Sequence, residues 1–247
     1  MTVVDVSVRH TITDYGDAGL LVSMSGRGAD ERWAAAQSLA DSLWSLRPEG
    51  LVDLVASYAD VFVAFDPLVT DHARMRAAVQ GAAFTYTVRG TSRSFVVPVV
   101  YGGEHGPDLP AVADELGIST AECVADHTAR PWMVRFCGAP VGAPLMEGGR
   151  TRASVARRAE PRTRVAPGSV AVSGRQSVIY PVASPGGWRL IGQTPVRLTD
   201  ASRDPIVPYR PGDTLRFVAI DESDWSRWNG DLTDLAAAYP PEQSSRA

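Results

Sequence analysis

The sequence predicts an α+β protein with two domains, a small N-terminal α/β sandwich followed by a β-barrel. One observation is the order of the elements: the first 90 residues alternate strand-like pairs with helical patterns, and the later residues form many short apolar runs. A second is the stretch 165–195, where five glycines and four prolines separate strand-like runs. Short strands joined by tight turns are typical of a closed or nearly closed barrel.

The N-terminal domain is expected to run in the order strand, strand, helix, strand, strand, helix. The strand-like runs are 3–10, 20–24, 51–57 and 61–65. Asp30 is expected to cap the first helix, whose apolar residues recur at helical spacing. Thr70 and Asp71 open the second helix, which ends at Gly81.

The domain boundary is expected near residue 90. This gives a sandwich domain over 1–90, a barrel domain over 91–230 and a polar C-terminal tail over 231–247. The segment 87–94 is polar and contains a glycine, as a linker often does. The last residues are polar and lack a pattern that packs, so we expect the tail to fray.

The barrel domain is expected to open with a strand at 95–101 and two short helices. Asp108 begins the first helix and Gly117 ends it, while Ser119 and Glu122 form a capping box for the second. The remaining features, in order, are a strand at 132–136, a flexible arm at 138–153, an arginine-rich segment at 157–164 and a last strand at 215–220.

Charge and composition exclude several classes of function. The net charge of −4 gives no electrostatic case for a nucleic-acid partner. All 24 basic residues are arginine, so the chain has no Walker A lysine, no Schiff-base lysine and no biotinyl-lysine. Biotin is therefore not expected on this chain.

The sequence carries no sign of a membrane or a metal. No apolar run approaches the roughly 18 residues that span a bilayer, and the N-terminus lacks the basic head and apolar core of a signal peptide. We therefore expect a cytoplasmic protein without a membrane partner. Cys123 and Cys137 are the only cysteines and lack metal-ligand spacing, so no metal site is expected.

The sharpest turn signal is the run from Ser184 to Trp188. Pro185 fixes one φ, while Gly186 and Gly187 permit positive φ and a close approach of the backbone to a ligand. Adjacent N–H groups in such a turn can form an anion-binding nest. A β-bulge or barrel corner explains the same glycines without a ligand. Trp188 is accordingly either a pocket wall or a barrel plug.

Two further groups of polar residues point to anion or amide binding. The segment 157–164 carries four arginines, whose planar forks match carboxylate or phosphate, although a solvated loop with some ion pairing is the alternative. Gln176 and Tyr180 stand four residues apart in a strand and so share a face. If that face points into the barrel mouth, they can hold an amide or carboxylate. If it points into the core, Tyr180 packs with its hydroxyl satisfied.

Several motifs occur in one order along most of the chain. They are Tyr101-Gly102-Gly103-Glu104, Gly106-Pro107-Asp108-Leu109, Arg158-Ala159-Glu160-Pro161-Arg162, Pro167-Gly168-Ser169-Val170, Pro185-Gly186-Gly187-Trp188, Ile191-Gly192-Gln193-Thr194 and Pro211-Gly212-Asp213. Taken together, they resemble the family that contains the B-type subunit of 5-oxoprolinase and allophanate hydrolase subunit 1. An inhibitor of a sporulation histidine kinase is related to the same family.

The resemblance implies a cyclophilin-like barrel for the second domain, without implying prolyl isomerase activity. It makes His127 a candidate acid or base, because it matches a family histidine just before a barrel strand. It also makes Arg162 a candidate for anion binding. The candidate catalytic residues are thus His127 and Gln176, and the candidates for binding substrate or phosphate are Arg162, Tyr180, Gly186, Gly187 and Trp188.

The function that the resemblance implies is that of one subunit of a heteromeric, ATP-dependent amidohydrolase that opens 5-oxoproline to glutamate. ATP and Mg²⁺ would be bound on or with a C-type partner chain, similar to allophanate hydrolase subunit 2. The chain alone would then be nearly inactive. Two alternatives are a carboxyltransferase-type subunit of a urea carboxylase or allophanate system, and a regulatory module that inhibits a sensor histidine kinase.

The chain departs from the family pattern in two places. Family members have an aromatic loop after the strand that matches 132–136, whereas residues 137–145 of this chain contain no aromatic side chain. The family pattern also has a glycine before the Tyr180-Pro181 pair, where this chain has β-branched residues. If those aromatics line the substrate pocket, altered specificity or lost activity is expected.

We predict that the two domains are separable folding units joined between residues 85 and 95, because the pattern of elements changes there. Limited proteolysis of the native chain should first cut in that segment or within 138–153. The fragments can be identified by mass spectrometry. Early cleavage inside 170–191 would contradict this domain assignment, since that stretch is expected to lie within the barrel.

Overall fold

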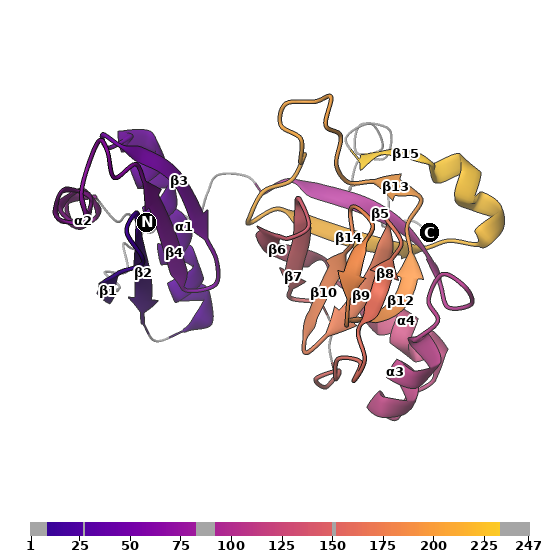
Figure 1. Ribbon diagram of the computed structural model, residues 1–247. Coiled ribbons are helices and arrows are strands. Elements are labelled where there is room, and N and C mark those ends of the chain that lie inside the picture. The colour runs from indigo at the N-terminus through magenta and orange to yellow at the C-terminus, as the bar shows by residue number, and fades with distance from the viewer. Residues whose placement is uncertain (1–8, 27, 83–91, 150–151, 233–247) are drawn as a thin grey trace, which may run out of the picture. The chain divides into compact units, whose positions relative to one another are not determined.

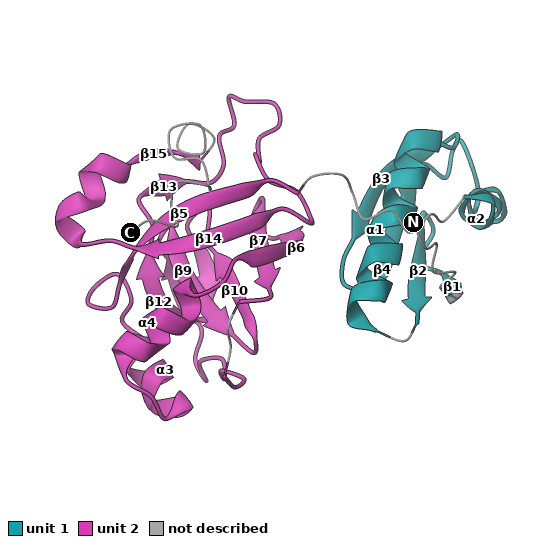
Figure 2. Ribbon diagram, turned by 180° about the vertical axis from the view of Figure 1, so that it is seen from behind, with its two compact units in different colours: residues 1–90 teal, residues 91–247 magenta. Residues whose placement is uncertain are grey.

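The computed structural model describes residues 9–26, 28–82, 92–149 and 152–232. It divides into two compact units, residues 1–90 and 91–247 (Figure 2). Each unit has its own hydrophobic core.

The first unit is a four-stranded antiparallel sheet with two helices packed on one face (Figure 1). The strands stand in the order β1-β2-β4-β3. Their bounds are Arg9–Asp14 for β1, Gly19–Ser25 for β2, Leu51–Ala56 for β3 and Asp60–Phe65 for β4, and the helices are Ala29–Leu46 for α1 and His72–Gly81 for α2. Burial alternates along β2 and β4, so every second side chain is buried under the helices.

The start of α1 differs from the sequence-based expectation. Gly28, not Asp30, is the N-cap residue, and the carboxylate of Glu31 accepts a hydrogen bond from the Gly28 backbone N–H at 3.2 Å. Asp30 lies in the first turn, where a negative charge suits the helix dipole. Asp71 caps α2 as expected, because its Oδ1 accepts from the backbone N–H of Arg74 at 2.8 Å.

The second unit is built on a closed barrel of seven strands in the order β10-β7-β6-β14-β5-β12-β9, which confirms the expected α+β fold with a barrel domain. Pairing of β9 with β10 closes it, and β14 runs parallel to β5. The barrel strands are β5 Ser94–Tyr101, β6 Trp132–Gly138, β7 Ala143–Glu147, β9 Ser169–Ser173, β10 Gln176–Ile179, β12 Arg189–Gln193 and β14 Thr214–Ala219. The other elements are α3 Leu109–Leu116, α4 Thr120–Thr128, β8 Arg162–Val165, β11 Ser184–Gly186, β13 Val196–Arg197, the 3₁₀-helix η1 Glu222–Trp228 and β15 Gly230–Asp231.

Apolar side chains fill the barrel from several strands. Trp132, Ile179, Ile191 and Phe217 are among the largest fully buried residues there. Helices α3 and α4 contact each other and pack against β12 and β14 respectively. The capping box of α4 is confirmed, since Ser119 and Glu122 exchange side-chain to backbone hydrogen bonds at 3.2 and 2.9 Å.

Two expectations about the second unit are wrong. The segment 138–153 is not wholly a flexible arm, because it contains β7, which pairs with both β6 and β10. The polar tail does not begin at residue 231 either. Asp231 is paired in β15, and Leu232 is completely buried in the main core; the later residues lie outside the described part.

A second core cluster lies where the short ribbon β8–β11 covers the outside of the barrel. It contains Ala143, Val165, Ala171, Val178, Tyr180 and Leu190. Gly186 lies directly against Tyr180 here, since a Cβ on Gly186 would come within 2.3 Å of the Tyr180 hydroxyl. Neither Gly186 nor Gly187 adopts a positive φ, so the turn does not use the freedom that these glycines permit. A Cβ on Gly187 would meet Pro161 at an ordinary 3.6 Å.

None of the helices in the described ranges combines the length and the apolar character needed to cross a bilayer.

The two neighbouring glycines provide a test of this packing. We expect Gly186→Ala to lower the free energy of unfolding by about 1–3 kcal/mol, because its methyl group overlaps the Tyr180 hydroxyl. Gly187→Ala should change it by about 0.5 kcal/mol or less, since the added atom has room. Urea unfolding of both variants measures the difference, and equal effects would contradict the packing described here.

Candidate functional site

The two candidate catalytic residues, His127 and Gln176, line one cavity at the helix-covered side of the barrel. Its walls are mostly apolar and come from α3, α4, the segment 152–155 and the barrel strands, with Val112, Val155 and Ile191 among them. Its empty space is about 440 Å³ when the open mouth and the solvent in it are counted. We refer to it as the end cavity.

His127 is almost completely buried, and both of its ring nitrogens have partners. Nδ1 lies 2.8 Å from the Tyr101 hydroxyl, and Nε2 lies 3.0 Å from the Ser177 hydroxyl. Ser177 in turn donates to the carbonyl of Ala171 at 3.3 Å. Because the Ser177 proton is directed to that carbonyl, Nε2–H donates to Ser177 and Nδ1 accepts from Tyr101. The ring also packs between Trp132 and Phe217.

Burial lowers the pKa of His127 from 6.5 to about 3, so the imidazole is neutral at pH 7. Although the last turn of a helix favours a cation, the buried imidazole at this position carries no charge at pH 7. A role as acid or base stays a prediction. In the present geometry such a role requires a rearrangement of the bonds to Tyr101 and Ser177.

An ion pair between Asp126 and Arg152 stands beside the cavity. Arg152 donates from Nε to the largely buried Asp126 carboxylate, and its guanidinium lies 3.9 Å from Glu122. Both Asp126 and Arg152 line the cavity. The structure therefore places one ion pair close to His127.

Gln176 belongs to a polar network that crosses three neighbouring strands. Its Nε2 donates to Glu147 Oε1 at 3.0 Å, and Glu147 Oε2 lies 3.2 Å from Arg135 Nε. We call Arg135, Glu147 and Gln176 the polar triad. Sequence reasoning missed Arg135 and Glu147, because Glu147 lay within the expected flexible arm. No sequence signal marked the bulge between Val134 and Phe136 that holds Arg135.

Arg162 is already paired with a carboxylate of the same chain. It binds Asp108 in a bidentate manner at 2.8 and 3.0 Å, and Arg158 adds a contact at 3.2 Å. Burial raises the pKa of Asp108, but the bonds from Arg162 and the Leu190 N–H outweigh it and hold the pKa below its usual value. The anion that Arg162 holds in this structure is therefore Asp108.

The other candidate binding residues lie in the packing of the outer ribbon. Tyr180 is buried there and hydrogen-bonds with the backbone of Trp188, which itself packs against the same cluster. The Arg157 guanidinium lies 5.8 Å from the centre of the Trp188 ring. None of Arg162, Tyr180, Gly186, Gly187 and Trp188 is among the residues that line the end cavity. A role for them in ligand binding stays a prediction.

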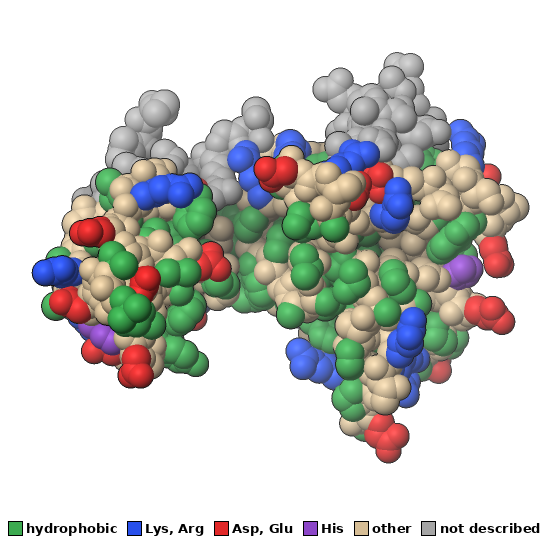
Figure 3. All heavy atoms as spheres, turned by 45° about the horizontal axis from the view of Figure 1, so that its top comes forward, with side chains coloured by type: hydrophobic (Ala, Val, Ile, Leu, Met, Phe, Trp, Pro, Cys, Tyr) green, Lys and Arg blue, Asp and Glu red, His purple; other side chains and the backbone are tan. Residues whose placement is uncertain are grey.

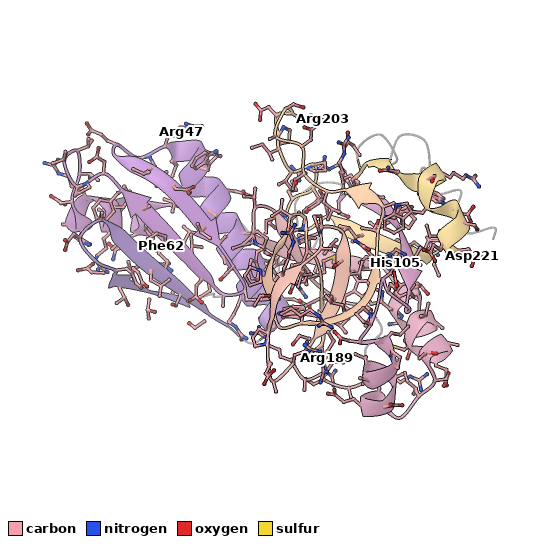
Figure 4. The ribbon with its side chains drawn as sticks, turned by 45° about the vertical axis from the view of Figure 1, so that its right-hand side comes forward. Arg47, Phe62, His105, Arg189, Arg203 and Asp221 are labelled. Atoms are coloured by element: carbon pink, nitrogen blue, oxygen red, sulfur yellow. The ribbon has the colours of Figure 1, made fainter. Side chains whose placement is uncertain are left out.

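His105 also makes contacts that the sequence did not suggest. Its Nδ1 lies 2.9 Å from Gln193 Oε1, its Nε2 lies 3.5 Å from Glu222, and its ring stacks on Trp225 at 4.9 Å. Figure 4 shows His105 beside the segment that carries Asp221. These contacts hold η1 against the barrel, so His105 has a structural role.

Metal binding finds no support among the described residues. No group of three or more histidine, cysteine or acidic side chains in these ranges is arranged to hold a metal ion.

The depressed pKa of His127 predicts a pH dependence of stability. Between pH 6.5 and about 3 the unfolded state binds a proton that the folded state excludes, so stability is lost as the pH falls through this window. From pH 7.5 to 5.0 we expect wild type to lose about 2 kcal/mol more unfolding free energy than His127→Gln. Urea titrations at both pH values measure this, and parallel losses would show that His127 titrates normally.

Curated relatives share a single name, that of the B-type subunit of 5-oxoprolinase. The protein of this name from Escherichia coli O157:H7 is 45% identical over 131 residues, which is 53% of this chain and 60% of that protein. The protein of the same name from Bacillus subtilis (strain 168) is 29% identical over 235 residues, covering 89% of this chain and 97% of the relative.

Solved structures share the fold. The crystal structure of TTHA0988 is 32% identical with a TM-score of 0.72, and the match covers 83% of this chain and 40% of that one. K. lactis urea amidolyase is 18% identical with a TM-score of 0.74 and shows the fold alone, covering 98% of this chain and 18% of its own. The family model described as "Carboxyltransferase domain, subdomain C and D" matches residues 10–209. Because this match covers well over half of its residues, the chain belongs to the carboxyltransferase domain family, subdomains C and D.

Proposed function

We propose that this chain is the B-type subunit of a heteromeric, ATP-dependent amidohydrolase whose substrate is 5-oxoproline. The observation that carries the proposal is the similarity to the Bacillus subtilis protein named for this role in 5-oxoprolinase, which extends over 97% of that relative. The end cavity supports it, because its walls are mostly apolar and include His127 and Gln176. 5-Oxoproline combines a small apolar ring with a lactam amide and a carboxylate, and the apolar walls suit the ring.

Two of the candidate phosphate clamps on this chain are engaged in contacts within the chain. Hydrolysis of an unstrained amide coupled to ATP calls for phosphate clamps and Mg²⁺ within the complex. Arg162, the strongest candidate clamp, is bound to Asp108, and Gly186 is packed against Tyr180. We therefore propose that the nucleotide and the metal are bound on a C-type partner chain.

A carboxyltransferase-type subunit is the second candidate function. It is favoured by the family model, whose description names a carboxyltransferase domain. The absence of lysine from this chain means that biotin would have to arrive on another chain.

The surface gives no reason to add nucleic acid as a partner. On the face seen in Figure 3, arginine and acidic side chains are interspersed rather than gathered into a basic stripe.

The proposal predicts that the isolated chain hydrolyses almost no ATP in response to substrate. The complex of this chain with its partner should show that activity. We expect substrate-dependent ATP turnover by the purified native complex with 5-oxoproline, and little with urea or allophanate. Phosphate release measures turnover for each compound in turn. Full turnover by the single chain would contradict the subunit role. Turnover with urea or allophanate but not 5-oxoproline would favour the carboxyltransferase alternative.

A further inference from the structure

We propose that the uncovered face of the sheet in the first unit is the surface on which the C-type partner chain docks. The partner surface that fits it is apolar at its centre and carries basic side chains at its edge. The inference rests on the proposed function, because that function supplies the partner. It goes further by assigning the contact to a face of the first unit, whereas the end cavity belongs to the second.

Helices α1 and α2 cover only one face of the sheet. Val61 and Val63 of β4 are completely buried beneath them. Because successive side chains of a strand point to opposite faces, Phe62 lies on the other face (Figure 4). Leu21 of β2 and Val55 of β3 both pair with Phe62 and share that face. We call it the open face.

The centre of the open face is apolar. Leu21, Phe62 and Val55 form a row across three strands, and Val55 is 51% exposed. The ring of Tyr15, which is 61% exposed, meets the ring of Phe62 edge to face at 5.5 Å. The uncovered face of an antiparallel sheet normally carries polar side chains. Exposed apolar side chains gathered in this way and rimmed by polar residues mark a site of protein interaction.

Acidic side chains stand around this row. Asp53 shares strand and face with Val55, and Asp60 shares them with Phe62, since each lies two positions away in a strand. The arginine side chains that the structure describes in this unit belong to the two helices or their ends, namely Arg32, Arg47, Arg74 and Arg76. In the sequence, residues 1–90 contain eleven acidic residues and seven arginines, so they account for the whole net charge of −4.

The charge of the open face decides which partner fits it. In a symmetric dimer of this chain, a two-fold axis through the face would bring Asp53 and Asp60 of the two copies toward one another, and like charges across an interface are costly. A partner with lysine or arginine around an apolar centre would pair with the same carboxylates. The C-type chain is the protein partner that the proposed function requires, so we assign the open face to it.

The test measures binding of the partner to variants of the full chain. The partner is the protein that co-purifies in stoichiometric amount with the tagged wild-type chain; it is identified by mass spectrometry and then purified separately. Its Kd is compared for wild type, Val55→Arg and Val55→Glu, because an exposed side chain contributes little to the fold. Leu46→Arg is the matched control, since Leu46 is 60% exposed but ends α1 on the other side of the sheet.

We expect Val55→Arg to raise the Kd about tenfold or more, because it sets a cation against an apolar centre with a basic edge. Val55→Glu should raise the Kd less, since its carboxylate can pair with that edge. Leu46→Arg should stay within about twofold of wild type. Replacing Asp53 and Asp60 together by asparagine should make the Kd less dependent on salt, because two charge pairs across the interface are lost.

Equal Kd values for Val55→Arg and Leu46→Arg would overturn the inference alone. So would a wild-type chain that is dimeric by itself and monomeric as Val55→Arg, because a second copy would then occupy the open face. A urea midpoint of Val55→Arg more than about 0.3 M below wild type would overturn it as well, since Val55 would then pack within the chain.

Two outcomes separate the inference from the proposed function. Absence of any stoichiometric partner of the wild-type chain would overturn both. A complex that depends on Val55 as expected but does not turn over 5-oxoproline would overturn the proposed substrate and support the docking surface.

Discussion

The buried carboxylate of Asp108 is the contact on which the arrangement of the second unit depends. It receives Arg158 and Arg162 from the arginine-rich segment and the backbone N–H of Leu190 from β12, while Asp108 itself stands at the start of α3. One anion thus connects a helix, a barrel strand and the outer ribbon. Removing either side of such a pair leaves an uncompensated buried charge, which is far more costly than the pair is stabilising. Arg158 and Arg162, whose sequence pattern suggests a phosphate clamp, therefore stabilise the fold by binding Asp108.

The barrel contains two sets of polar groups, one enclosed in the core and one partly exposed to solvent. Inside, Tyr101, His127 and Ser177 form a chain in which each proton has an acceptor, and burial keeps the imidazole neutral. Such a closed chain specifies a unique packing of the core, and a change of protonation would break it. The polar triad is different, because Glu147 keeps 31% of its side chain exposed. Glu147 is therefore accessible to solvent, whereas His127 is enclosed in the core.

The sequence was sufficient where local rules decide the structure. The capping box at Ser119 and Glu122, the cap at Asp71 and the closed barrel follow from propensity and pattern. It was insufficient where the partner is distant in the chain. From the sequence alone, Arg162 is predicted to be free to bind an anion. The fold brings Asp108, 54 residues away in the chain, against it. Glu147 and Gln176 are 29 residues apart, and only strand pairing makes them neighbours. No periodicity predicts a bulge at Arg135.

One of the two departures from the family pattern, the missing aromatic loop, is centred at the opposite end of a hairpin from the polar triad. Residues 139–142 connect β6 to β7 next to the pair Gly138–Ala143, whereas Glu147 pairs with Met133 at the far end. The turn is fixed by other contacts, since a Cβ on Gly142 would come within 2.4 Å of Val207 and its carbonyl accepts from the Tyr209 hydroxyl. Small side chains in this turn therefore change the surface near Val207 without moving Glu147 or Gln176. The missing aromatics are therefore a change at one end of the hairpin that leaves the pairing of β7 with β6 and β10 intact.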